Sequence, residues 1–181
     1  YNAMSEWMVK GKMRADYLRE CSNVDLDKIQ SNQVLMNMFN KPEQYITVMN
    51  RIVELFGSLD KFRICEIGGG YGGQAKVILD NYKPSFYHMI DLPEPLALQR
   101  RYLDGYPVEL FSEQTGQKYD LVISNYAISE IPDNKLYIDE VLRKSVHGYI
   151  TCNTDLVKLD WPHQRIPDIV GERKTNYVLV W

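Results

Sequence analysis

The sequence predicts an α/β fold, a doubly wound, mostly parallel, seven-stranded sheet with N-terminal helices and an antiparallel C-terminal edge strand. The first observation is a short apolar run over residues 62–67 that stops at a glycine cluster and is followed by an amphipathic helical stretch over residues 74–82. The second is the alternation of further strand-like and helix-like segments as far as Cys152. The third is the tail, where the turn-like GERKTN precedes the strand-like YVLVW, as an antiparallel hairpin requires.

Size and charge exclude several classes of function. The chain has 181 residues, of which 45% are hydrophobic and 25% charged, and this is enough for one α/β domain with a core. A net charge of −3 gives no electrostatic footprint for nucleic acid, and no apolar run approaches the roughly 20 residues of a membrane span. We therefore expect neither nucleic acid nor a membrane span, and a cytoplasmic location. The three cysteines, Cys21, Cys65 and Cys152, lack CxxC spacing, so we expect buried thiols and no metal site.

Helices are expected before the first strand. They define an N-terminal helical segment over residues 1–57, ahead of a ligand-binding domain over residues 58–181. Helices in that position could cover a ligand site. The expected helices are residues 5–21, residues 26–39, and a third that opens at Pro42 and stops at Gly57.

The remaining elements follow in alternation. One helix is expected to open at Pro95, because proline suits the first helical turn, and another lies over residues 136–142. The strands expected after the glycine cluster are residues 86–90, 107–111, 119–124 and 148–152, then a shorter one over residues 166–170 and the terminal strand over residues 177–181.

The glycine cluster matches two ligand patterns. Gly68, Gly70 and Gly73 satisfy the GxGxxG pattern of dinucleotide sites, whereas Glu66, Gly68, Gly70 and Gly72 satisfy the acid-x-Gly-x-Gly-x-Gly pattern of S-adenosylmethionine sites. Glu66 discriminates between them, because a carboxylate repels a pyrophosphate but favours the cationic amino group and sulfonium of S-adenosylmethionine. The loop is therefore interpreted as a methyl-donor site.

Other residues are expected to complete that donor site. Asp91 ends the second strand about 20 residues beyond the glycine turn, where a carboxylate can accept hydrogen bonds from both ribose hydroxyls. Tyr71 in the loop and Leu92 after Asp91 are also assigned to the cofactor site. Asn125 and Tyr126 lie at the end of the fourth strand and are expected to line the donor.

Four segments together carry a family resemblance. EIGGGYGGQA, IDLPEPLALQRRYL, SNYAISEI and GYITCNTD occur in this order from Glu66 to Asp155. The chain resembles class I S-adenosylmethionine-dependent methyltransferases and, more narrowly, the sugar O-methyltransferase family of bacterial polysaccharide gene clusters. The resemblance implies a Rossmann-like sheet with strand order 3-2-1-4-5-7-6, S-adenosylmethionine as cofactor with S-adenosylhomocysteine as product, and a sugar, nucleotide-sugar or polysaccharide hydroxyl as acceptor. The expected partners are a small-molecule sugar and, as an option, a second copy in a homodimer.

A hydroxyl acceptor must lose its proton, so a general base is expected near the carboxyl ends of the strands. Glu130, after the fourth strand, is the first candidate, and its other interpretation is a surface carboxylate or helix cap. His163 is the second candidate, although a lone loop histidine is often merely exposed. Asp155 could help to bind a divalent ion, but no spacing supports a metal site.

Two other functions remain open on the sequence. The GxGxxG spacing alone would permit an NAD(P)-binding oxidoreductase. A donor-binding domain without an acceptor site, acting in a larger assembly, is the non-enzymatic alternative.

Overall fold

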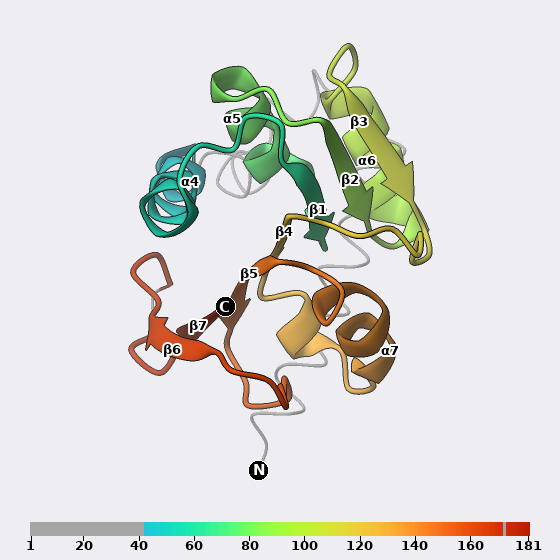
Figure 1. Cartoon of the computed structure of the whole chain (residues 1–181). Coiled ribbons are helices and arrows are strands. Elements are labelled where there is room, and N and C mark those ends of the chain that lie inside the picture. The colour runs from blue at the N-terminus through green and yellow to red at the C-terminus, as the bar shows by residue number, and fades with distance from the viewer. Residues whose placement is uncertain (1–41, 172) are drawn as a thin grey trace.

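The computed structural model describes residues 42–171 and 173–181, which form a seven-stranded sheet with the order β3-β2-β1-β4-β5-β7-β6 (Figure 1). The first five strands run parallel, whereas β7 lies antiparallel between β5 and β6. This confirms the predicted doubly wound sheet with an antiparallel C-terminal edge. The strands are β1 (Arg63–Ile67), β2 (Phe86–Ile90), β3 (Val108–Phe111), β4 (Leu121–Asn125), β5 (His147–Cys152), β6 (Gln164–Pro167) and β7 (Tyr177–Val180).

Alternating side chains divide the core between the two faces of the sheet. On β1, Ile64 belongs to one buried cluster and Cys65 to the other, as the two-residue period of a strand requires. The first cluster packs under α4 (Pro42–Phe56) and α5 (Gly73–Asn81). The second packs under η1 (Ile128–Glu130), α7 (Lys135–Tyr137) and η2 (Ile138–Leu142). Helices therefore cover both faces of the sheet.

Helix α6 (Pro93–Tyr102) begins two residues before the predicted Pro95. Both prolines fit the first turn, where a missing N–H costs no intrahelical hydrogen bond, so the sequence could not distinguish the two starts. Strand β6 likewise ends at Pro167 rather than continuing to residue 170. The Asp168 carboxylate accepts hydrogen bonds from the N–H groups of Val170 (2.9 Å) and Gly171 (3.1 Å), and this turn ends the strand.

Helix α4, the first of the described elements, packs into the core of the sheet domain. Its residues Val48, Met49 and Ile52 are buried in the first cluster. The predicted helices over residues 5–21 and 26–39, and Cys21, lie outside the described residues. Among the described helices, none combines the length and apolar character that a membrane crossing requires.

Candidate functional site: a glycine loop and the carboxyl ends of β4 and β5

The loop between β1 and α5 has a backbone that favours glycine. Gly68, Gly70 and Gly72 have φ angles of +73°, +60° and +99°, which side chains with a Cβ rarely adopt. A Cβ added at Gly68 would lie 2.0 Å from the Cβ of Ala127, so glycine is also required there by contact with the β4–η1 connection. The loop therefore packs directly against the chain that follows β4.

Gly70 lies at the open part of this loop. A Cβ built on it would meet no atom of the described residues within 4 Å. Its N–H donates to the Oδ2 atom of Asp91 at 3.2 Å, and its carbonyl accepts from the Gln99 amide at 2.8 Å. The same amide donates to Asp91 Oδ2 at 2.8 Å. Gln99 and Asp91 thus hold the loop in a shape that leaves space for a ligand above Gly70.

Glu66 lies on β1 directly before the glycines and is 2% exposed. Burial raises the pKa of its carboxyl group to about 7, even though Tyr87 donates a hydrogen bond to Oε2 at 2.8 Å and opposes the shift. The nearby Asp91 carboxylate raises the pKa further. A carboxylate held in this way would be stabilised by a cation at the loop, whereas a pyrophosphate would disfavour its ionised form.

Tyr71 and Leu92, which are also assigned to the cofactor site, differ in how exposed their side chains are. Tyr71 is buried, with its ring edge-on to Tyr45 and Tyr102 at centroid distances of 5.9 and 5.0 Å. These contacts hold the Tyr71 ring within the loop, and its assignment to the cofactor site stays a prediction. Leu92 is 63% exposed directly after Asp91 and is therefore available to contact a ligand.

Asn125 and Tyr126 lie at the carboxyl end of β4, as predicted. The side-chain oxygen of Asn125 accepts a hydrogen bond from the Thr151 hydroxyl at 3.2 Å. Tyr126 has a φ of +70°, which is uncommon for a bulky residue, and its hydroxyl donates to Asp168 at 2.6 Å. Its side chain thus connects β4 to the β6–β7 turn.

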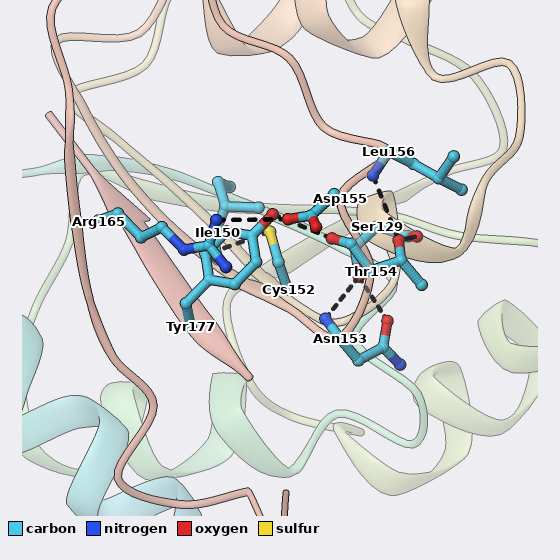
Figure 2. Close-up of polar contacts among 9 residues, drawn as sticks. All are labelled: Ser129, Ile150, Cys152, Asn153, Thr154, Asp155, Leu156, Arg165 and Tyr177. Carbon is cyan, nitrogen blue, oxygen red and sulfur yellow. Dashed lines mark hydrogen bonds and ion pairs between the residues drawn. The ribbon is translucent and has the colours of Figure 1, made fainter. Parts of the chain in front are cut away.

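Glu130 ends η1, only five residues after β4. Its Oε1 atom accepts a hydrogen bond from the side-chain amide of Asn153 at 2.8 Å. Ser129 holds the same asparagine, because its hydroxyl lies 2.9 Å from Asn153 Oδ1 and accepts from the Asn153 N–H at 3.3 Å (Figure 2). Thr154 donates to the Ser129 carbonyl at 2.5 Å. These contacts fix the half-buried Glu130 carboxylate between the ends of β4 and β5.

His163 lies apart from this constellation, and Asp155, which follows Thr154, has a partner of its own. His163 is exposed directly before β6, and its Nδ1 atom lies 2.8 Å from the Trp161 carbonyl oxygen. The first residue of β6, Gln164, pairs with Val180, which pairs with Tyr149 near the amino end of β5. His163 is therefore at the end of the sheet opposite to Glu130. The exposed Asp155 forms an ion pair with Arg165 at 3.3 Å (Figure 2).

Sequence reasoning missed Gln99 and Asn153. Gln99 is fully buried on α6. In the sequence it lies at helical spacing between Leu96 and Leu103, and a polar residue on an apolar helix face could have indicated a buried hydrogen-bonding role. Asn153 gave no comparable signal, because its contact with Glu130 joins segments 23 residues apart. Within residues 42–171 and 173–181, no three His, Cys, Asp or Glu side chains are grouped so as to hold a metal ion.

Solved structures of methyltransferases and of another protein in complex with S-adenosylmethionine share this fold. The magnesium protoporphyrin IX methyltransferase ChlM from Synechocystis, crystallised with S-adenosylmethionine, matches with a TM-score of 0.61 and 12% identity over 92% of this chain and 95% of its own. A mutant of MtNAS in complex with S-adenosylmethionine matches with a TM-score of 0.61 and 16% identity over 98% of this chain and 75% of its own. A complex containing the Haloferax volcanii Trm112 methyltransferase activator matches with a TM-score of 0.51 and 16% identity, over 61% of this chain and 54% of the other.

These matches establish the class of fold, that of the S-adenosylmethionine-dependent methyltransferases. The chain spans about half the length of the matched chain in the Haloferax complex and nearly all of ChlM. No protein-family model matches the sequence, and no curated protein is significantly similar.

Proposed function

We propose that the protein is an S-adenosylmethionine-dependent O-methyltransferase that acts on the hydroxyl of a sugar, a nucleotide sugar or a polysaccharide. The observation that carries the proposal is the buried Glu66 carboxylate directly before a glycine loop with open space above Gly70. A cationic donor fits this charge, and a dinucleotide pyrophosphate does not, which disfavours the oxidoreductase alternative. The sugar acceptor is supported by the resemblance of four sequence segments to sugar O-methyltransferases.

The residues present fit S-adenosylmethionine as donor and S-adenosylhomocysteine as product. Glu66 would favour the positive charge of the donor, and the Asp91 carboxylate would accept hydrogen bonds from the ribose hydroxyls in addition to those it receives from the loop. Leu92 and Asn125 would contact the ligand from either side of the loop. When bound, the cofactor supplies an electrophilic methyl group.

Glu130 is the proposed general base. It lies on the segment that packs against the glycine loop through Ala127, and Asn153 holds its carboxylate in one orientation. In the reaction, the acceptor oxygen would displace the donor sulfur from the methyl carbon, so that the C–S bond breaks and S-adenosylhomocysteine leaves, while the hydroxyl proton passes to this carboxylate. Alignment of the acceptor oxygen with the methyl group is expected to supply most of the remaining acceleration.

A methyl-transfer assay with Glu130→Gln tests this assignment. Transfer of labelled methyl from S-adenosylmethionine is followed over a panel of monosaccharides, nucleotide sugars and oligosaccharides. Glu130→Gln keeps the shape but removes the basicity, so kcat should fall by about 10²–10⁴ while affinity for S-adenosylhomocysteine stays within about twofold. His163→Ala is the matched control, and it should retain turnover because His163 lies at the opposite end of the sheet.

Retention of most turnover by Glu130→Gln would remove the base role from that residue, and loss in His163→Ala would transfer it. A protein that binds S-adenosylhomocysteine but methylates no member of the panel would instead fit the non-catalytic donor-binding alternative.

A further inference from the structure

A groove of about 660 Å³ lies beside the carboxyl ends of β5 and β6. Its walls come from residues 153–155, 165–168 and 174–177. We propose that this groove is the acceptor site, and that it takes the uncharged, polyhydroxylated part of a saccharide rather than the diphosphate of a nucleotide sugar. This inference rests on the proposed methyl transfer and narrows its substrate class.

The topology brings this groove to the ligand-binding edge of the sheet. Tyr177 on β7 pairs with both Cys152 at the end of β5 and Pro167 at the end of β6. The carboxyl ends of β5 and β6 therefore meet the start of β7 at the same edge as the carboxyl ends of β1 and β4. Ligands of parallel α/β sheets bind beyond this edge. The Tyr126 hydroxyl donates a hydrogen bond to Asp168 at 2.6 Å and so connects the β6–β7 turn to the end of β4.

A continuous line of contacts joins the glycine loop to the groove. Gly68 packs against Ala127, which lies three residues before Glu130, the proposed base. Glu130 accepts a hydrogen bond from Asn153, and Asn153 itself lines the groove. A hydroxyl held beside Asn153 would therefore be separated from the proposed base by one side chain.

The charges lining the groove balance one another. The described walls carry two carboxylates, Asp155 and Asp168, and two cations, Arg165 and Lys174. Arg165 already has two partners, because it forms an ion pair with Asp155 at 3.3 Å and its guanidinium lies 3.4 Å from the ring centroid of Tyr177 (Figure 2). Lys174 forms no ion pair within the described residues, but a single lysine lacks the forked donors with which arginine binds a diphosphate.

The polar atoms left over suit hydroxyl groups. Asn176 is 9% exposed, and its buried Oδ1 atom finds no donor within the described part of the chain, although its Nδ2 atom contacts Asp168 at 3.5 Å. A buried acceptor without a donor is costly, so a small movement of the Asn176 side chain toward a donor bound in the groove would be favourable. The exposed Thr175 adds a hydroxyl group to the same walls. Neutral hydroxyl and amide groups of this kind exchange hydrogen bonds with the hydroxyls of a sugar.

A titration followed by NMR tests the groove separately from catalysis. The ¹⁵N-labelled protein with S-adenosylhomocysteine is titrated with neutral methyl glycosides and disaccharides, and in parallel with UDP-glucose. Neutral saccharides should shift the amide resonances of Asn153, Thr175 and Asn176. Thr175→Phe, which places a ring in the groove from an exposed position, should weaken this binding by about tenfold or more. Ser112→Phe is the control, because Ser112 is exposed after β3 at the other edge of the sheet.

Lys174→Ala separates the neutral acceptor from the anionic one. Binding of a neutral saccharide should change by less than about threefold. Tighter binding of UDP-glucose than of every neutral saccharide, with a large loss in Lys174→Ala, would overturn the proposal. Shifts by no saccharide at these three residues would also overturn it.

Failure of the groove and failure of the proposed function give different results. If a saccharide is methylated with the same kcat/KM by Thr175→Phe and by the unaltered protein, the groove is not the acceptor site, although methyl transfer stands. If saccharides occupy the groove but no methyl group is transferred, the proposed function fails while the binding site stands.

Discussion

Glu66 is a buried carboxyl group whose environment favours its neutral form. Burial and the neighbouring Asp91 raise its pKa to about 7 from a usual value of 4.5. A cation bound at the glycine loop would stabilise the charged form and lower that pKa, so Glu66 is the residue that discriminates among ligand classes. The identity and position of this acid were readable from the sequence, but its burial was not, because the Tyr87 hydroxyl that covers it comes from the next strand.

The raised pKa of Glu66 predicts how stability depends on pH without ligand. Between about pH 4.5 and about pH 7 the folded protein binds more protons at Glu66 than the unfolded chain does. The free energy of unfolding should therefore fall as pH rises through this window and level off above it, with a contribution on the order of 3 kcal/mol.

Glu66→Gln should remove this contribution. Urea denaturation at several pH values across the window should show the difference between the unaltered protein and the variant narrowing or changing sign as pH rises. Glu54→Gln, at an exposed position on α4, is the control and should follow the unaltered protein. Parallel curves for Glu66→Gln and the unaltered protein would show that Glu66 is not buried as described.

At the scale of elements, the β1–loop–α5 unit was predictable because its signals are local. An apolar strand, a glycine turn and a helix follow one another within residues 62–82, and no distant contact is needed to recognise them. The placement of Gln99 under this loop was not predictable, because it depends on how α6 packs.

The loop geometry makes a prediction about donor binding. Gly70→Val would place a branched side chain in the open space above the loop and should abolish S-adenosylmethionine binding measured by calorimetry. Gly105→Val is a matched control, since Gly105 also has a positive φ (+81°) and open space around it but lies after α6. Both variants incur similar backbone strain of about 1–2 kcal/mol. Equal donor affinity in the two variants would mean that the ligand lies elsewhere.

At the scale of the whole molecule, the alternation of elements predicted a parallel, doubly wound sheet, whereas its strand order was implied by the family resemblance and is confirmed by the structure. Parallel strands joined by helices wind in one hand, and the terminal hairpin pairs with the β5 side of the sheet. The groove was beyond the sequence, because it forms only when the β6–β7 turn folds back to the ends of β4 and β5. The sequence also could not decide between Glu130 and His163 as general base. The register of β6 on β7 supports Glu130, because it places His163 at the opposite end of the sheet.

The central claim is that the glycine loop binds a methyl donor, and it is tested most directly by calorimetric titration of the unaltered protein with S-adenosylhomocysteine and, separately, with NADH. We predict one-to-one binding of S-adenosylhomocysteine and no measurable binding of NADH, because the carboxylate of Glu66 would meet a cationic amino group in the first case and a pyrophosphate in the second. Tight binding of NADH with none of S-adenosylhomocysteine would contradict the account.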